Sequence, residues 1–211
     1  MQNMKILLIA VLLGMSWVAS AQWRLGVKLV PAVTWGRIET ASDTLSVSGN
    51  KGAVRLMGGI VADNHFRENY VFSTGLNFIS KKYKYHAQAP GIPYNESYNL
   101  QYIQLPLSLK LYTNEIGLDT RLYFHFGNNL EFNIHHNLQD NPDALATKIL
   151  FFDTSVFAST GVEFKLGTDT SLFAGFGYHR GLLDIIYKNI PLDQSLVLRS
   201  NLIGMEMGVK F

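Results

Sequence analysis

Apolar and polar residues alternate along most of this chain from Trp23 onward, and the alternation is clearest at the end. Between Asn201 and Phe211 every second residue is apolar, while the residues between them are mostly small or charged (Ile203, Met205, Met207, Val209 and Phe211 against Gly204, Glu206, Gly208 and Lys210). A period of two is typical of a β-strand with one face against an apolar medium. Seven further stretches repeat this pattern, so the chain is predicted to contain eight β-strands.

The eight expected strands are separated by segments that contain turn-forming and polar residues such as Gly, Pro, Asn and Asp. They span residues 23–35, 52–62, 70–85, 97–112, 120–133, 151–166, 171–183 and 195–211. In the fourth strand Pro106 lacks a backbone donor, which predicts a local bulge or irregular pairing at that position.

Long and short connections alternate between the expected strands. The long ones are residues 37–51, 86–96, 135–150 and 184–194, and the short ones are residues 64–69, 113–119 and 167–170. Outer-membrane barrels have an even number of strands, short periplasmic turns and longer extracellular loops. The alternation therefore favours a barrel in the outer membrane with both termini in the periplasm.

Residues 1–21 have the features of a secretory signal peptide. Lys5 precedes an apolar run from Ile6 to Leu13, and the segment ends in the small-x-small pattern Ala19–Ala21. The apolar run is shorter than the roughly 20 residues that a membrane-spanning helix needs. We therefore expect a signal peptide over residues 1–21 and a β-barrel domain over residues 22–211.

Composition narrows the fold class further. The formal net charge of +2 gives no strong attraction to nucleic acid. The chain has no cysteine, which excludes disulfides and a lipoprotein anchor. After the signal peptide no apolar run is long enough for a membrane helix, and strands cross lipid only as a closed barrel. The prediction is an all-β fold: an eight-stranded antiparallel up-and-down transmembrane β-barrel.

A soluble lipocalin-like barrel has the same number of strands and the same alternation, so it is an alternative. A lipocalin would turn its large apolar residues inward around a ligand. In this chain one phase holds Leu, Phe, Val and Ile, and the other holds Gly, Ser and Asn with ionisable residues from nearly every strand. An eight-stranded barrel has room inside only for side chains. We expect the second phase to fill the lumen, where Glu163 and Glu206 need cationic partners such as Lys28, Arg55 or Arg121.

The segment Leu100–Lys110 resembles the Tyr-Leu-x-x-Pro-Leu-Leu-Leu-Lys strand of PorT-like outer-membrane β-barrels from Bacteroidota. Phe72–Phe78, followed by Lys81 and Lys82, resembles the preceding strand of that family, and Tyr123–Gly127 resembles the next one. The resemblance implies an outer-membrane barrel over essentially the whole mature chain. It also implies an association with type IX secretion, the process with which the namesake is associated.

Two groups of residues are candidates for chemistry. Adjacent His135 and His136 in the third long loop could bind a metal, although such pairs are more often only solvated. Four residues that share the inward phase could form a Ser–His–Asp arrangement for acyl transfer, as in lipid-modifying outer-membrane enzymes (His125, Asp153, Ser155 and His179). Polar filling of the lumen is the simpler interpretation of these four residues.

The sequence therefore predicts a small, non-enzymatic outer-membrane β-barrel protein that is envelope-structural or partner-binding, with an accessory role in protein secretion. We expect no catalytic residues, no metal site and no cofactor. The expected partners are outer-membrane lipid and an envelope or secretion protein, with no nucleic acid, and the barrel is expected to be monomeric. A lumen- or rim-active lipid-modifying enzyme and a soluble lipocalin-like periplasmic ligand binder are the alternatives.

Overall fold

A computed structural model of the chain describes residues 23–40, 46–49, 52–89, 92–137, 148–187 and 196–211. The predicted signal peptide, residues 1–21, lies outside the described residues. No helix in the described ranges is long and apolar enough to cross a membrane. Within these ranges eight long strands form the wall: β1 (Trp23–Thr40), β3 (Ala53–Arg67), β4 (Tyr70–Ala89), β5 (Ile92–Gly117), β6 (Thr120–Asn137), β8 (Phe152–Lys165), β9 (Ser171–Gly181) and β11 (Leu196–Lys210).

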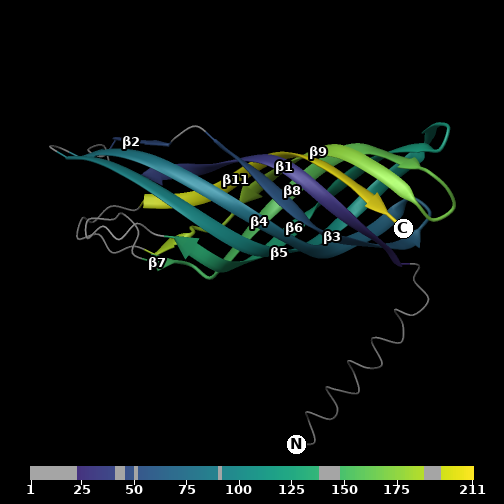
Figure 1. Cartoon of the computed structure of the whole chain (residues 1–211), viewed down its shortest axis with the longest axis horizontal. Coiled ribbons are helices and arrows are strands. Elements are labelled where there is room, and N and C mark those ends of the chain that lie inside the picture. The colour runs from purple at the N-terminus through teal and green to yellow at the C-terminus, as the bar shows by residue number, and fades with distance from the viewer. Residues whose placement is uncertain (1–22, 41–45, 50–51, 90–91, 138–147, 188–195) are drawn as a thin grey trace, which may run out of the picture.

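Each long strand pairs antiparallel with the next long strand along the chain, and β1 pairs with β11 to close the barrel (Figure 1). This confirms the predicted all-β, eight-stranded up-and-down barrel. Three short strands lie at the end opposite the C-terminus: β2 (Ser46–Gly49), β7 (Lys148–Ile149) and β10 (Ile186–Tyr187). β2 pairs with β4, and β7 pairs with β10. We call this the loop end, and the opposite end the turn end.

At the loop end the strands run further than the sequence predicted. The prediction of a loop over residues 86–96 is wrong, because β4 and β5 remain paired as far as Ala89 and Ile92. The register that pairs Asn77 with Gln104 continues unbroken to this point, so the growing ladder overrides the local turn signals. Pro93 is tolerated because it stands near the start of β5.

The other predicted long loops also contain some strand. β1 reaches Thr40 and β6 reaches Asn137, and the short strands β2, β7 and β10 occupy parts of the remaining segments. The parts of these loops at residues 41–45, 50–51, 138–147 and 188–194 lie outside the described residues.

Two of the three turns at the turn end are shorter than predicted, whereas the connection between β8 and β9, residues 166–170, is one residue longer. β3 continues to Arg67, with a register shift just before it, so the predicted turn over residues 64–69 is reduced to two residues. β5 continues to Gly117, which leaves Leu118 and Asp119 as the turn. Asp119 has a φ of 54°, a left-handed conformation that Asp adopts more readily than most residues.

Pro106 interrupts the β4–β5 ladder, which confirms the predicted irregular pairing. The paired residues on either side, Thr74–Leu107 and Asn77–Gln104, keep one register, so there is no bulge. The hydroxyl of Thr74 donates a hydrogen bond of 2.8 Å to the carbonyl oxygen of Pro106. A side chain thus makes a bond across the two strands at the point where the proline has no N–H to donate.

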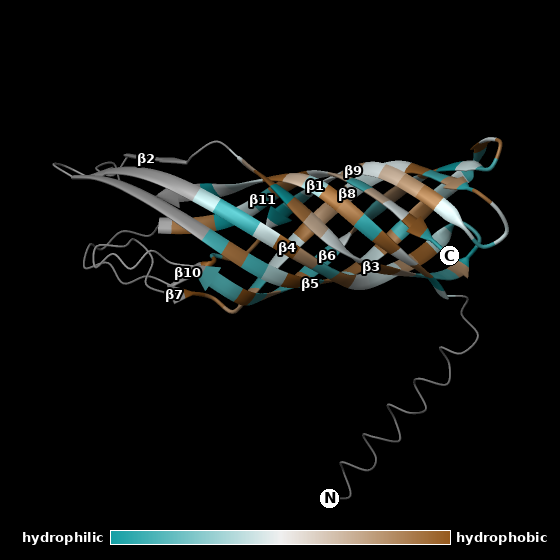
Figure 2. Ribbon diagram, viewed as in Figure 1, coloured by the Kyte–Doolittle hydropathy of each residue, from teal (hydrophilic) through white to brown (hydrophobic). Residues whose placement is uncertain are grey.

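The two residue phases face opposite media. Large apolar residues of one phase lie exposed on the outer wall, as the brown segments along the strands show (Figure 2). Ionisable residues of the other phase are buried inside; Asp63 and Lys210 are 0% exposed and Glu131 is 1% exposed. A lipocalin would show the reverse arrangement, so the soluble alternative is excluded.

Candidate functional site

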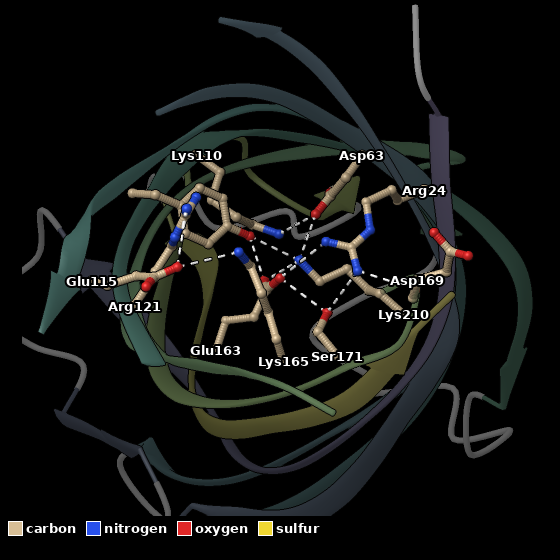
Figure 3. Close-up of polar contacts among 11 residues, drawn as sticks. Arg24, Asp63, Lys110, Glu115, Arg121, Glu163, Lys165, Asp169, Ser171 and Lys210 are labelled. Atoms are coloured by element: carbon tan, nitrogen blue, oxygen red, sulfur yellow. Dashed lines mark hydrogen bonds and ion pairs between the residues drawn. The ribbon is translucent and has the colours of Figure 1, made fainter. Parts of the chain in front are cut away.

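The most distinctive site is the charged lumen. Near the turn end four residues from four strands form one group that we call the turn-end cluster: Asp63 on β3, Lys110 on β5, Glu163 on β8 and Lys210 on β11 (Figure 3). Asp63 Oδ2 accepts hydrogen bonds from Lys110 Nζ at 2.9 Å and Lys210 Nζ at 2.8 Å. Lys210 also pairs with Glu163. The cluster therefore ties together strands that lie on different sides of the barrel.

Neutral donors complete the turn-end cluster. The hydroxyl of Tyr112 donates to Glu163 Oε2 at 2.6 Å and accepts a hydrogen bond from Lys210 Nζ at 2.8 Å. The hydroxyl of Ser73 donates to Asp63 Oδ1 at 2.5 Å. Removing two charges from water costs several kcal/mol per ion, and further hydrogen bonds to both partners offset that cost. Each charged group of the turn-end cluster therefore has a hydrogen-bonding partner inside the barrel.

Cations line the rim of the turn end. Arg24 Nη1 lies 3.5 Å from Glu163 Oε1, which extends the turn-end cluster toward the mouth. Arg121, predicted to pair with an inward glutamate, instead pairs with Glu115 at 3.4 Å, as does Lys165 at 3.3 Å. That prediction is wrong because Glu115 is close to both cations on the extended end of β5. The hydrogen bond from Lys165 holds the pKa of the exposed Glu115 carboxyl below its usual value.

A second group, the loop-end cluster, fills the lumen toward the loop end. It consists of Lys81 on β4, Glu131 on β6 and Asp153 on β8. Lys81 pairs with Glu131 and lies 3.8 Å from Asp153 Oδ2. Glu131 Oε1 also accepts hydrogen bonds from Gln104 at 3.0 Å and Ser155 at 2.7 Å. One buried lysine thus serves two buried carboxylates.

Between the clusters Glu206 is held by hydroxyl groups. Tyr123 donates to Glu206 Oε1 at 2.8 Å and Ser159 donates to the same oxygen at 2.9 Å. Glycines make the tyrosine contact possible, since a Cβ at Gly161 or Gly175 would lie only 2.5 or 2.4 Å from the Tyr123 hydroxyl. The sequence predicted a cationic partner such as Lys28 for this carboxylate, and Lys28 does attract it electrostatically, although no direct ion pair to Glu206 is among the described contacts.

Lys28, the cation expected to pair with Glu206, faces the same small lumen cavity as that carboxylate. The cavity has a volume of about 10 Å³. Such a volume holds about one water molecule. Lys28 and Glu206 are therefore neighbours across a cavity and do not form a direct ion pair.

Aromatic rings fill the remaining space between the clusters. The Phe157 ring packs edge-on against His125 at 4.9 Å and stacks on His179 at 5.1 Å. Tyr102 and Tyr123 are 0% and 1% exposed. Together with the two ion clusters, these side chains line small cavities in the middle of the lumen.

The histidines considered for acyl transfer have other partners. His125 Nε2 is hydrogen-bonded to the hydroxyl of Ser108 at 2.7 Å. His179 Nδ1 is hydrogen-bonded to the side-chain amide of Asn129 at 3.1 Å. Both rings are therefore engaged with neutral side chains in the middle of the lumen.

Ser155 and Asp153 belong to the loop-end cluster. The Ser155 hydroxyl donates to Glu131, and Asp153 Oδ1 accepts a 2.7 Å hydrogen bond from the backbone N–H of Thr154. Among the described contacts neither residue is bonded directly to a histidine. The structure therefore does not bring together the nucleophile, base and orienting acid that acyl transfer requires.

The two adjacent histidines lie near the end of β6. His135 and His136 are both exposed, and His136 Nδ1 is hydrogen-bonded to Asn133 Oδ1 at 3.2 Å. Over the ranges that the structure describes, no group of three or more potential metal ligands includes them.

By their alternation Asp63 and Lys110 belong to the inward phase, but the sequence does not identify them as partners of Lys210. The alternation shows which residues face inward. It does not show which inward residues meet across the lumen, because that depends on the stagger between strands. For Lys210 the available sequence signal was its position between the outward residues Val209 and Phe211, which places it in the inward phase.

Comparisons with known proteins agree with this architecture. The family described as "Outer membrane protein beta-barrel domain" matches residues 23–187. The crystal structure of the outer membrane protein OprG from Pseudomonas aeruginosa is 12% identical, covers 89% of this chain and 95% of its own, and has a TM-score of 0.52. The outer membrane protein AlkL in lipid bilayers is 9% identical over 90% of this chain and 89% of its own, with a TM-score of 0.54. At these identities the likeness shows a shared fold alone. A comparison with curated proteins found no match.

Proposed function

We propose that this chain, which belongs to the outer membrane protein beta-barrel domain family, is a non-enzymatic barrel that stabilises the envelope and presents its loop end to a protein partner. The filled lumen is the observation that carries the proposal. Two ion clusters cross-link the wall from inside, and the cavity between them has a volume of about 10 Å³. A lumen filled in this way between the clusters favours a rigid scaffold over a substrate site or a solute channel.

The shape of the loop end supports the binding part of the proposal. β5 pairs with β6 only from Asn99 onward, whereas its pairing with β4 continues to Ile92. The β4–β5 hairpin therefore extends beyond β6, and on its other edge the short strand β2 pairs with β4 as far as Gln88 (Figure 1). Binding residues often lie on segments that a rigid scaffold holds in position. The barrel wall holds the β4–β5 hairpin in this way.

The resemblance to PorT-like proteins supports adding a role in protein secretion to the proposal. The strand motif at Leu100–Lys110 lies within β5, next to the strand that carries Phe72–Phe78. Adjacent strands thus carry the two segments that resemble consecutive strands of PorT-like proteins. We include an accessory role beside protein-secretion components on this basis.

The proposed orientation has the loop end outside the cell and both termini in the periplasm. The natural chain has no cysteine, so single cysteines are unambiguous reporters. Ser42→Cys in the first long connection should react with a membrane-impermeant maleimide on intact cells. Thr168→Cys in a short turn is the matched control and should react only after the outer membrane is opened. The opposite result would reverse the orientation.

The same two variants test partner binding. A short crosslinker attached at the Ser42→Cys position should give an adduct with an envelope protein, and the Thr168→Cys variant should not give that adduct. Identical adducts from both variants, or none from the first, would contradict the proposed partner at the loop end.

A further inference from the structure

A pocket opens at the turn end of the barrel, beside the turn-end cluster. It has a volume of about 780 Å³, which lies in the usual range for ligand sites. Cationic side chains and carboxylates line it together (Arg24, Arg67, Arg121 and Lys165, with Glu68 and Asp169). We call this site the turn-end pocket. Its cations outnumber its carboxylates, so it favours an anionic ligand.

The cations of the turn-end pocket have few carboxylate partners. Arg67 is exposed, and its side chain has no ion pair or hydrogen bond among the described contacts. Arg121 Nη2 and Lys165 Nζ share a single oxygen, Glu115 Oε1, at 3.4 and 3.3 Å. A guanidinium has five N–H donors and an ammonium has three. Arg121 Nε is a buried donor without a partner in the described part of the chain, so the pocket has unused charge and unused donors.

Glu115 indicates which anion this side of the pocket takes. It is a carboxylate from the end of β5, and it lies within ion-pair distance of both Arg121 and Lys165. Its side chain is 46% exposed, so a second carboxylate can reach the same two cations from water. Exposed ion pairs contribute little to stability, and exchange of one carboxylate for another therefore costs little.

The cations form two groups on opposite sides of the opening. Arg24 and Arg67 belong to β1 and β3, whereas Arg121 and Lys165 belong to β6 and β8, four strands further around the eight-stranded wall. Figure 3 shows Arg24 and Arg121 on opposite sides of the barrel. A ligand that contacts both groups therefore needs more than one anionic group and enough length to span the opening.

The turn-end pocket also offers apolar surface. Three exposed aromatic side chains line it beside the cations (Trp23, Phe66 and Phe211). Arg24, Arg121 and Lys165 belong to the inward phase, so they face the opening of the barrel and not the surrounding lipid. The ligand reaches them from the aqueous side. An extended peptide with several carboxylates and some apolar side chains matches these features.

We propose that the turn-end pocket binds an acidic peptide segment of an envelope protein. Carboxylates of the peptide pair with Arg67 on one side and with Lys165 and Arg121 on the other. This goes beyond the proposed function, which concerns the loop end, and it holds for either orientation of the barrel. Its failure would leave the roles of the lumen and of the loop end unaffected.

The test uses two labelled peptides that differ only in charge. The acidic probe is an octapeptide of alternating glutamate and tyrosine, and the control peptide has glutamine in place of glutamate. Binding to folded protein in neutral detergent is followed by fluorescence anisotropy, and the signal of protein-free micelles is subtracted. The test variant combines Arg67→Gln with Lys165→Gln. The control variant removes the same charge at the loop end by combining Lys82→Gln with Arg180→Gln.

Wild type and the control variant should bind the acidic probe more tightly than the glutamine peptide. The test variant should lose about tenfold in affinity for the acidic probe, since two exposed ion pairs contribute a few-fold each. Equal losses in the test and control variants would mean general charge attraction and would overturn the proposal. Wild-type affinity in the folded test variant would overturn it too.

A lipid headgroup is the other source of an anion at this end. Short-chain phosphatidic acid should displace the acidic probe from wild type only at higher concentration than the unlabelled acidic peptide does. Displacement at lower concentration would assign the pocket to a lipid phosphate and overturn the proposal.

Glu115→Gln tests the pocket in the opposite direction. It removes the carboxylate that Arg121 and Lys165 share, so both cations become available to the peptide. This variant should bind the acidic probe a few-fold more tightly than wild type does, with unchanged binding of the glutamine peptide. Folding of each variant is checked by heat-modifiable migration on a gel. Affinity at or below that of wild type in folded Glu115→Gln protein would contradict the proposed contacts.

Discussion

Lys210→Met should destabilise the barrel by about 3–5 kcal/mol, the usual cost of removing one partner from a buried ion pair. Lys210 is 0% exposed and contacts Asp63, Glu163 and the Tyr112 hydroxyl. Without the ammonium group Glu163 loses its closest described cation, and Lys110 is the one described cation that still pairs with Asp63. The free energy of unfolding, measured in urea with protein in lipid vesicles, is the quantity to compare.

Two further variants separate this effect from general damage. Lys165→Met removes a lysine from the exposed rim, and it should cost no more than about 1 kcal/mol. The combination of Lys210→Met with Glu163→Gln should be less damaged than the sum of the two single variants, because residues in one network are coupled. Additive losses would contradict the turn-end cluster as described.

Lys81→Met is expected to have a similarly large effect, again about 3–5 kcal/mol. Its ammonium group is the cation that Glu131 and Asp153 share, and all three side chains are at most 4% exposed. Removing it leaves two buried carboxylates close together, which repel each other. Unfolding in urea and heat-modifiable migration should both show the loss.

The adjacent residue provides a matched control for this prediction. Lys82 belongs to the outward phase of β4, so Lys82→Met makes the same chemical change on the other face and should leave the unfolding free energy nearly unchanged. Glu131→Gln should restore part of the stability lost in Lys81→Met. Equal effects of the two lysine substitutions would mean that the assignment of inner and outer faces is wrong.

The barrel wall could be predicted from the sequence because its signal is local. A period of two assigns each residue to a face, and this assignment holds from Trp23 to Phe211 wherever the structure describes side chains. The ends of the strands were less predictable. The β4–β5 ladder runs past Pro93 because pairing in register extends an existing hairpin, which local turn signals do not reveal.

Contacts within the lumen could not be predicted in the same way. Ser155 and His179 share the inward phase, yet each bonds to other residues. Asp63 and Lys210 are 147 residues apart in sequence and meet inside the barrel. The stagger of the strands decides such meetings, and one strand's alternation carries no information about it.

Ion clusters and aromatic rings are expected to seal the lumen of this barrel against the passage of ions. Single-channel recording in a planar lipid bilayer tests it most directly, with insertion of the folded protein confirmed by heat-modifiable migration. The wild-type protein should give no current steps above the leak of the bilayer at low applied voltage. A stable conductance that is proportional to voltage in the wild-type protein would contradict the sealed lumen.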